Sequence, residues 1–466
     1  MAAITEAADI QAIVERGFGS LAGSSYLLLR VEKPALAKAW LRGLPITSLA
    51  NALATRLDRV CQIAFTAPGL AALGFDAEAE PGFAPEFLDG MASDERRSHR
   101  LGDDGTNAPE HWRWGVGERE PHVLIILLAG AEDIAAFETE YLAALPGAGC
   151  KLVAASRGNT SVRREPFGFT DGLSQPDLDW HGTLKTGGAK DRVYRPTLAM
   201  GETLLGYSNE YGFVTDYPKA RELGRNGSYL VYRQLAQDVQ GFWQWLHDSA
   251  GEGEAIRLAE VMVGRGIDGD PLPGVAKSGE GLNDFTFAGD ADGIRCPIGS
   301  HIRRANPRSG DDPQGHRGFF RDIISSLGLK GTAIHDAVAS TRFHRIVRRG
   351  RAYGPTVTPE QAMRGEGAGD ESGLHFICLN ANISRQFEFV QGSWLASPYF
   401  AGLSGEQDPM LGNRLPVSGG GTSDAFAYVD GSGCPRLLSG LPQFVTVKGG
   451  AYFFLPGLRG LEMILA

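Results

Sequence analysis

The sequence is poor in cysteine and has none of the cysteine spacings that build a covalent or metal-bound framework. Disulfide scaffolds and structural zinc sites bring cysteines together in closely spaced pairs. The five cysteines of this chain are far apart, and no two form a Cys-x-x-Cys pair: Cys61, Cys150, Cys296, Cys378 and Cys434. This odd, scattered set predicts reduced thiols and a cytoplasmic location.

A long apolar run and an excess of basic residues are also missing. The longest apolar run, Val123 to Ala129, is too short to span a bilayer, and the first 18 residues contain acidic side chains but no apolar segment typical of a signal peptide. The net charge of -10 does not provide the basic surface that nucleic-acid phosphates require. We therefore expect neither a membrane nor a nucleic acid as a partner.

Glycine and proline, by contrast, are abundant, with 63 and 25 residues among 466 and no fixed period. This composition predicts long, ordered loops rather than a fibrous chain. Hydrophobic residues make up 42% of the sequence, which is enough for a sizeable core. The length fits two or three domains, or one large duplicated unit.

The first third of the chain alternates between strand-like and helix-like hydrophobic patterns. We expect strands at 25–32, 60–67, 121–128 and 151–155, and helical segments at 34–57 and 131–145. The resulting order, β-α-β-β-α-β with insertions, is the ferredoxin-like pattern.

A similar order recurs later in the chain. We expect strands at 228–234, 343–349, 374–379 and 444–455, and helices at 238–264 and around 383–394. The predicted fold class is α+β, with two ferredoxin-like domains of antiparallel sheets packed together. The first domain is assigned to residues 1–165 and the second, with long insertions, to residues 166–466, with the final strand free to pack back on the first.

The segment 264–318 interrupts this pattern, because it is rich in Gly, Asp, Pro and Arg and has almost no periodicity. Long aperiodic insertions are usually functional or disordered, and this one contains His301. Ten arginines lie between His301 and Arg351: Arg303, Arg304, Arg308, Arg317, Arg321, Arg342, Arg345, Arg348, Arg349 and Arg351. They form either a solvated basic patch or, in part, a site for an anionic ligand.

Asp171 lies in the sequence Gly168-Phe-Thr-Asp-Gly172. Asp-Gly is a favoured pair in tight turns, so a purely structural turn is one interpretation. The other is that the glycines let the backbone approach a flat ligand, while the short carboxylate points at its face. The local sequence alone leaves both open, as it does for His301 among ten histidines.

Three segments around these residues resemble the signature segments of the dye-decolourising peroxidases, a bacterial and fungal family of haem enzymes. The stretch 167–176 contains the family's Gly-x-x-Asp-Gly signature. The stretch 296–308 is similar to the segment whose histidine binds iron, and 345–354 is similar to the distal-arginine segment. Further similar segments are 200–212, 386–391 and 449–456. The long insertions resemble those of the larger, cytoplasmic subgroup.

The resemblance implies a pair of ferredoxin-like domains with one haem b in the second, bound through its iron by His301. Hydrogen peroxide would be reduced to water through a ferryl intermediate, and dyes, phenolics or other small organic one-electron donors would be oxidised. Asp171 would carry the proton between the peroxide oxygens, and Arg348 would stabilise the developing charge.

Weaker assignments follow from the same resemblance. Besides His301 and Arg348, the residues expected to contact haem are Phe169, Thr170, Gly172, Arg303, Leu374 and Phe376. Arg303, with Arg308 as a second candidate, would bind the propionates. Leu374 and Phe376 share one face of a strand and would line the distal side, with plain core packing as the alternative.

The hydrogen-bond partner of His301 stays unassigned. An iron-bound histidine donates its second N–H to a carboxylate or a carbonyl, which raises its basicity. In several relatives the partner is an acid in the segment corresponding to 381–387, and that segment contains no acid here. The partner is therefore Glu388, an acid from elsewhere, or a neutral oxygen that would weaken imidazolate character.

Other roles remain open beside the peroxidase. One is a haem-handling protein that binds haem or releases its iron with little turnover, and another is a haem-free interaction module. Relatives form monomers through hexamers, so a homo-oligomer is also open. Some relatives are packed inside protein nanocompartments by a flexible C-terminal tail, and the lack of a polar linker before 461–466 argues against encapsulin cargo.

Large substrates cannot reach a buried haem edge, so radicals on tyrosine or tryptophan could relay electrons. The candidates by position are Tyr353, Trp394, Tyr399 and Tyr452. Core packing is the alternative for each.

Overall fold

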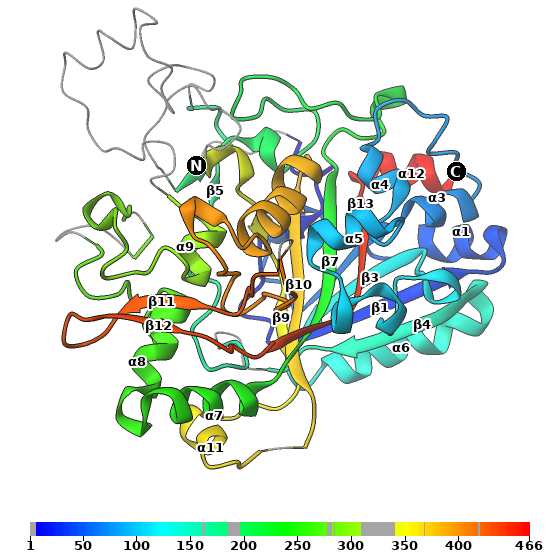
Figure 1. Cartoon of the computed structure of the whole chain (residues 1–466). Coiled ribbons are helices and arrows are strands. Elements are labelled where there is room, and N and C mark those ends of the chain that lie inside the picture. Colours follow the sequence, from blue (N-terminus) through cyan, green and yellow to red (C-terminus); the bar gives the residue numbers. More distant parts are fainter. Residues whose placement is uncertain are drawn as a thin grey trace, which may run out of the picture.

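The computed structural model describes residues 6–160, 164–184, 196–276, 282–283, 285–308, 341–367, 369–417 and 420–466. Within this part of the chain, nine strands form one sheet with the order β4-β1-β3-β2-β13-β7-β10-β8, and β9 pairs with β10 (Figure 1). Two small sheets, β5-β6 and β11-β12, lie outside it. The sheet has two halves, and each half has the strand order of one ferredoxin-like unit.

The first half has the strand order β4-β1-β3-β2 expected of a ferredoxin-like unit. Its main elements are β1 (Gly23–Val31), α1 (Pro34–Arg42), α2 (Leu49–Ala54), β2 (Arg59–Phe65), β3 (Val123–Ala129), α6 (Ile134–Ala148) and β4 (Cys150–Arg157). Local sequence sets the helix ends: proline begins α1, and α6 ends at Gly149, whose φ of 65° suits glycine. Three short helices, α3 (Ala67–Ala72), α4 (Pro85–Asp89) and α5 (Glu95–Leu101), fill the long β2–β3 connection.

The second half repeats the same order as β13-β7-β10-β8. Its main elements are β7 (Ser228–Gln237), α7 (Val239–Ala250), α8 (Glu252–Val263), β8 (Val347–Arg348), β9 (Arg351–Tyr353), β10 (Ser372–Asn380) and β13 (Val445–Leu455). Strand β13 also pairs with β2 through Phe454 and Phe65, which makes the two halves one continuous sheet. The predicted α+β fold with two ferredoxin-like units is confirmed.

Some predicted elements differ in the structure. The strand expected at 343–349 is a 3-10 helix at Thr341–His344 followed by the two-residue β8. The ring of Phe343 stacks on Tyr211 and that of His344 on Phe389, each at 3.7 Å, and these contacts draw the segment out of strand geometry. The helix expected around 383–394 is present as two π-helical segments, Ser384–Glu388 and Val390–Leu395.

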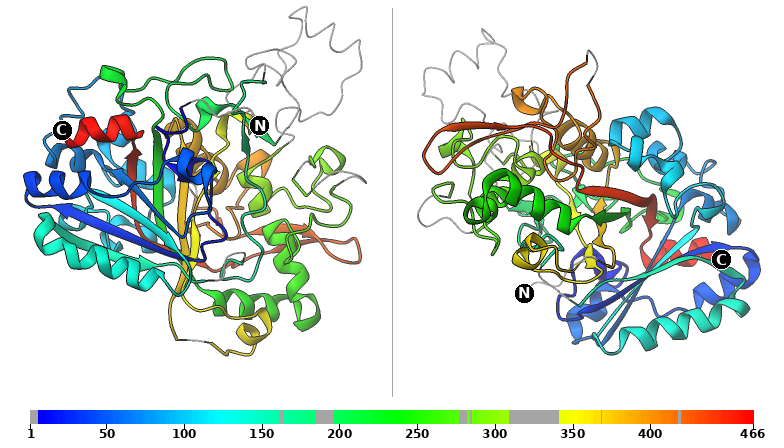
Figure 2. Two further views of the ribbon diagram at one scale, coloured as in Figure 1. Left: turned by 180° about the vertical axis from the view of Figure 1, so that it is seen from behind. Right: turned by 60° about the horizontal axis from the view of Figure 1, so that its bottom comes forward.

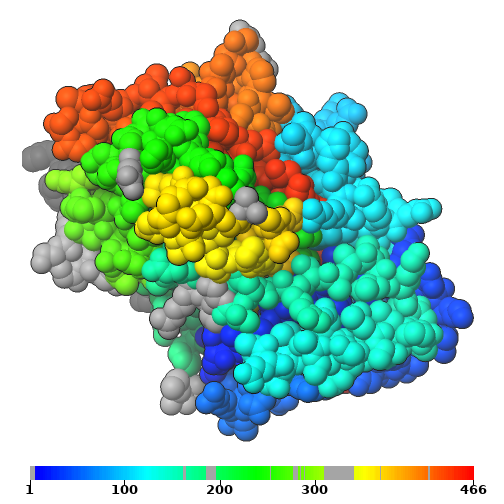
Figure 3. Space-filling model, turned by 90° about the horizontal axis from the view of Figure 1, so that it is seen from below, coloured from blue at the N-terminus to red at the C-terminus, as the bar shows by residue number. Residues whose placement is uncertain are grey.

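Several elements were not predicted at all. Besides α3, α4, α5 and β9, they include β5 (Asp177–Leu178), β6 (Thr197–Leu198), α9 (His301–Ala305), α11 (Pro359–Met363), β11 (Phe426–Val429), β12 (Pro435–Leu438) and α12 (Leu458–Leu465). Most are too short to carry a hydrophobic period. Helix α9 begins at His301 inside the aperiodic segment, and α11 lies against α7 on the lower face of the molecule (Figure 3).

The sheet buries both of its faces. On β1, Leu27 and Leu29 belong to one buried cluster. Tyr26 and Leu28 belong to a second cluster, which also contains Tyr232 of β7. The Tyr26 and Tyr232 rings are 5.6 Å apart although three strands separate β1 from β7, so the sheet curls until its two halves face each other.

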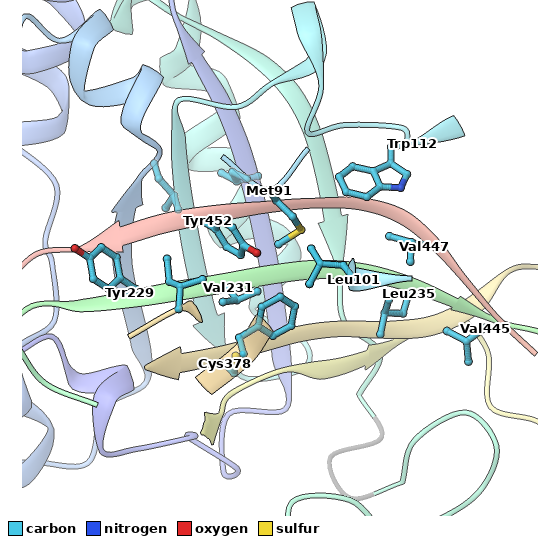
Figure 4. Packing of buried hydrophobic residues seen from close by; sticks show 14 of the residues in the cluster. Met91, Leu101, Trp112, Tyr229, Val231, Leu235, Cys378, Val445, Val447 and Tyr452 are labelled. Carbon is cyan, nitrogen blue, oxygen red and sulfur yellow. The ribbon is translucent and has the colours of Figure 1, made fainter. Parts of the chain in front are cut away.

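The outer face of the second half is the face turned away from the first half of the sheet, and a cavity lies against it. Figure 4 shows Leu235 of β7 with Val445 and Val447 of β13 on one side of the sheet, with Leu101 of the first half packed nearby. The views in Figure 2 show α7, α8 and the β11–β12 hairpin around this half of the molecule. Among the described residues, no helix is both long enough and apolar enough to cross a membrane.

Candidate functional site

A large cavity lies against the outer face of the second half. It contains about 1890 Å³ of space free of protein atoms, including the space at its opening. Much of its lining is apolar, including Val263, Ile302, Leu374, Phe376, Leu395 and Leu411. His301, Asp171 and Arg348, which lie far apart in the sequence, all line this one cavity.

His301 is held from behind by a buried carboxylate. Its Nδ1 lies 3.0 Å from Oδ2 of Asp408, whose side chain is fully buried. The other carboxylate oxygen of Asp408 accepts hydrogen bonds from the amides of Met410 and Leu411 at 2.9 and 2.8 Å. With Nδ1 bonded, the Nε2 atom of His301 is left for a ligand in the cavity.

The charges of this pair support each other. Burial alone would raise the pKa of Asp408, but the charge and the hydrogen bond of His301, with Arg304 nearby, outweigh burial and lower it. Burial alone would likewise lower the pKa of His301, and Asp408 reverses this and raises it. An imidazole with such a partner is a stronger electron donor to a metal.

The structure thereby resolves which acid partners His301. Of the open alternatives, it is an acid from elsewhere in the chain, 107 residues beyond the histidine. Glu388 is committed to other groups, since its oxygens contact Arg100 at 2.7 Å and the Tyr452 hydroxyl at 2.9 Å. No local signal near Asp408 could have identified it, because an Asp before a proline is typical of a turn.

Asp171 lies on a loop that forms part of the cavity wall. Its neighbours Phe169, Thr170 and Gly172 also line the cavity. Gly168 and Gly172 have φ values of 102° and 79°, a region that side chains strongly disfavour, which explains both glycines of the signature. The amide of Thr170 donates to the carbonyl of Ile267 at 3.0 Å and fixes the far side of the loop.

Arg348 joins this loop from β8. Its Nη1 donates to Oδ1 of Asp171 at 3.2 Å, and its backbone amide donates to Oε1 of Gln175 at 2.9 Å. Gln175 therefore ties the segment after Asp171 to the strand that carries Arg348. Oδ1 of Asp171 also accepts from the Gly172 amide at 2.6 Å, and among the described residues nothing bonds its Oδ2.

Leu374 and Phe376 alternate with His375 along β10, and both line the cavity. His375 points the other way, into the contact between the two halves of the sheet. There it lies 2.9 Å from the Tyr232 hydroxyl and 3.1 Å from the Ser156 hydroxyl. The two-residue period that joined Leu374 and Phe376 therefore places them on the cavity side.

Arg303 is not brought into the cavity. Its guanidinium bonds the carbonyls of Cys296 and Asp290 and stacks over Phe287 at 4.6 Å. Arg308 likewise bonds the carbonyl of Phe285 at 2.9 Å. Residues two apart on a helix do not share a face, so a cavity-facing His301 turns Arg303 away.

The arginine-rich segment is not a solvated patch either. Where it is described, its guanidiniums mostly bind backbone carbonyls of other segments. Arg304 bonds the carbonyls of Trp394 and Ser397, and Arg349 bonds those of Ile13 and Val14. The positions of Arg317 and Arg321 lie outside the described residues.

The four relay candidates differ in their surroundings. Tyr353, Trp394 and Tyr452 are buried, whereas Tyr399 is 57% exposed. The hydroxyl of Tyr353 donates to Glu371 at 3.0 Å, and the ring of Trp394 packs on Phe389. Core packing thus accounts for three of them, and an electron-relay role stays a prediction for all four.

Comparisons with known proteins agree with this geometry. No family model matches the chain. A curated relative, the dye-decolorizing peroxidase msp1 of Mycetinis scorodonius, is 28% identical over 450 residues, which cover 89% of this chain and 78% of the relative. The multifunctional dye peroxidase DyP2 of Amycolatopsis sp. is also 28% identical, over 86% of this chain and 81% of its own. Over most of its length, the chain is similar to dye-decolourising peroxidases.

The fold of this peroxidase is that of solved members of the family. A dye-decolorizing peroxidase solved in complex with cyanide superposes with a TM-score of 0.76 at 22% identity and covers the whole of both chains. The structure of an ancestral D-type dye decolorizing peroxidase gives a TM-score of 0.72 at 25% identity, again over both chains in full. These matches extend over both ferredoxin-like units and the connections between them.

Members of the family are haem enzymes, and the residues of this peroxidase fit haem. The cavity is wide and largely apolar, it has one imidazole backed by a carboxylate, and an Asp–Arg pair lines it as well. Imidazole is a common axial ligand of haem iron. Among the described residues, no three His, Cys, Asp or Glu side chains gather into a separate metal site.

Proposed function

We propose that this peroxidase binds haem b through His301 and reduces hydrogen peroxide to water with Asp171 and Arg348, at the expense of small organic one-electron donors such as dyes and phenolics. The observation that carries the proposal is the convergence of His301, backed by Asp408, and the Asp171–Arg348 pair on one cavity. When bound, haem would supply the iron at which peroxide is reduced and the oxidising equivalents passed to the donors.

The residues around the cavity have separable roles in this proposal. His301 would hold the cofactor from one side, and Asp408 would keep its ring oriented and basic through the Nδ1 hydrogen bond. The apolar side chains of Leu374 and Phe376 would limit the entry of water. Arg345 lines the cavity and Arg303 does not, so Arg345 would take the place of Arg303 as a partner of a haem propionate.

Asp171 would move the proton. Its Oδ1 is occupied by Arg348 and by the Gly172 amide, so Oδ2 is the atom that would take a proton from one peroxide oxygen and return it to the other. The guanidinium of Arg348 would stabilise negative charge that develops as the peroxide bond breaks.

The experiment compares the wild-type enzyme with Asp171→Asn in a reaction of the haem-loaded protein with hydrogen peroxide. A positioned acid–base group contributes about 10² to 10⁴ in rate, and we expect a loss of this size with an unchanged Soret band. A solved structure of the same fold contains 2,6-dimethoxyphenol, so this phenol is a suitable donor for steady-state assays. An unchanged rate in Asp171→Asn would exclude the proposed proton transfer.

A haem-handling protein would give a different result. It would bind haem through His301 but show little peroxide-dependent oxidation in the wild type, and Asp171→Asn would change nothing. Release of iron from bound haem would then be the activity to measure.

A further inference from the structure

A second carboxyl group, that of Glu165, stands at the start of the loop that carries Asp171. Glu165 lines the same cavity. Its Oε2 accepts a hydrogen bond from the Phe167 amide at 3.0 Å, and its Oε1 accepts one from the Phe169 amide at 2.9 Å. The backbone of Glu165 closes the same turn, because its amide donates to the Phe169 carbonyl and its carbonyl accepts from the Gly168 amide.

The carboxylate also fastens this turn to the sheet. Nε2 of Gln237, the last residue of β7, donates to Oε2 of Glu165 at 2.9 Å. Strand β7 is paired on both sides over nearly its whole length, so it is a rigid support. Trp243 of α7 adds a hydrogen bond from its indole to the Phe167 carbonyl at 3.0 Å.

The last of these contacts, at the Phe169 amide, lies two residues before Asp171. The Asp171 side chain is held by one 3.2 Å contact with Arg348 and by its neighbour's amide. Its backbone is placed by the turn that Glu165 holds and by the neighbouring Thr170, whose amide donates to the Ile267 carbonyl at 3.0 Å. Placement matters because a reacting group displaced by about 1 Å can lose on the order of 10² in rate.

We propose that Glu165 is a positioning residue for Asp171, which holds the Asp171 loop through its carboxylate and loses part of that hold when it takes up a proton from the cavity. The inference rests on the proposed function of Asp171. It assigns a role to a cavity-lining carboxyl that neither binds the cofactor nor shuttles the proton.

The surroundings of Glu165 place its ionisation near neutral pH. Burial, and to a smaller extent the charge of Asp171, raise the pKa of Glu165 to about 7 against the lowering effect of Gln237 and the two amides. Besides Asp171, the other charged or titratable groups that line the cavity are His301 from α9, Arg348 from β8, Arg233 from β7, Asp103, Arg265, His344 and Arg345. A protonated carboxyl accepts hydrogen bonds less strongly, so the turn loosens as the pH falls below about 7.

The first test measures the turn itself. Hydrogen exchange of the Phe167 and Phe169 amides is followed by mass spectrometry or NMR in the haem-loaded wild type and in Glu165→Gln. We expect exchange at pH 8 to be about tenfold faster in the variant, which corresponds to the loss of one typical hydrogen bond. Equal protection in the two proteins would overturn the inference.

A matched control is Asp179→Asn. Asp179 is also a buried carboxylate that accepts hydrogen bonds from amides of its own loop, those of Thr183 and Leu184, but it does not line the cavity. We expect Asp179→Asn to leave the exchange of Phe167 and Phe169 at the wild-type rate. A change as large as that of Glu165→Gln would show a general loosening of the fold and would overturn the inference.

The second test is the pH profile of the reaction with peroxide. As the pH falls, the wild-type rate constant for the reaction with peroxide should decrease through an ionisation near pH 7. The variant Glu165→Gln should lack that ionisation, and at pH 8 it should react about 10 to 100 times more slowly than the wild type. A residue with a merely structural role would lower the rate without removing the ionisation, and this outcome would count against the proposal.

The two proposals can fail separately. If Asp171→Asn keeps its rate, the proposed function fails, while the amide exchange still judges whether Glu165 holds the loop. If Asp171→Asn loses its rate but Glu165→Gln keeps both its exchange and its pH profile, the proposed function stands and Glu165 has no positioning role.

Discussion

The two sides of the cavity are built very differently. Behind His301, the carboxylate of Asp408 is fully buried and accepts from the ring and from two amides. Asp171 and Arg348, by contrast, are 39% and 37% exposed and share a single 3.2 Å contact. In the proposed function, the side of His301 and Asp408 is a fixed mount for haem, and the side of Asp171 and Arg348 is the open side through which peroxide enters and water leaves.

This contrast follows from the elements that supply each side. His301 begins helix α9, and Asp408 lies in a connection; Arg304 of α9 bonds the carbonyls of Trp394 and Ser397. Asp171 comes from a loop fixed at a few points, and Arg348 comes from a two-residue edge strand. A site that must accept peroxide and release water needs a reachable side, and side chains at an edge provide it.

Loss of the fixed mount has the largest expected effect. In His301→Ala we expect haem affinity to fall by more than about 100-fold, since loss of the group behind such a ligand already costs 10- to 100-fold. The measurement is the Soret absorbance and the haem content of the purified protein. His247→Ala, on the exposed side of α7, is the control. Normal haem content in His301→Ala would show that another residue binds the iron.

Removal of the guanidinium on the open side should affect rate but not binding. In Arg348→Leu we expect the rate constant with peroxide to fall by about 10² to 10³, because a preorganised donor to developing charge is lost. The Soret band should stay in place. The control is Arg59→Leu, which removes a surface arginine paired with Glu140. A fall in haem content rather than in rate would mean that Arg348 belongs to the mount.

A smaller change is expected when the mount is weakened but not removed. In Asp408→Asn we expect haem affinity to fall by about 10- to 100-fold and the Fe(III)/Fe(II) potential to rise, because the imidazole becomes a weaker donor. Spectroelectrochemistry gives the potential. Glu388→Gln is the matched control, because that carboxylate contacts Arg100 and Tyr452 but not His301. A shift of equal size in the control would remove the special role of Asp408.

The same contrast explains what the sequence could predict. Most strands of both halves could be predicted because a sheet buried on both faces selects continuous apolar runs, such as that of β3. Leu374 and Phe376 fall on the cavity side together because side chains two apart on a strand point to the same face. The β11–β12 hairpin and α12 escaped prediction because the hairpin has short strands and α12 follows directly on the apolar β13.

In the site, residues that lie within the sequence motifs could be predicted. A residue that reaches the site from a distant part of the sequence could not. Asp171, His301 and Arg348 follow from the resemblance, whereas Asp408 reaches His301 only through the packing of two loops. Arg303 illustrates the opposite case. The resemblance implied that it would contact the same ligand as His301, but a helix turns residues two apart in different directions.

The smallest expected effect concerns the support behind the open side. His375 lies on β10 between Leu374 and Phe376 and is fully buried, and burial lowers its pKa from 6.5 to about 3. Below pH 6.5, His375 takes up a proton in the unfolded chain but stays neutral in the folded protein. The free energy of unfolding therefore decreases as the pH falls from 6.5 to 3. From pH 6.5 to 5.5 this one residue should cost about 1 kcal/mol.

Replacing His375 by phenylalanine should remove that part of the pH dependence. The Tyr232 and Ser156 hydroxyls lose a partner, so His375→Phe is expected to be less stable at pH 6.5, but its stability should fall by about 1 kcal/mol less than that of the wild type on going to pH 5.5. Urea unfolding at both pH values gives the difference, with exposed His99→Phe as the control. Because His375 supports the strand of Leu374 and Phe376 and not the mount of His301, the haem content at pH 6.5 should stay the same. A loss of haem in this variant would show that the two sides of the cavity are coupled through the sheet.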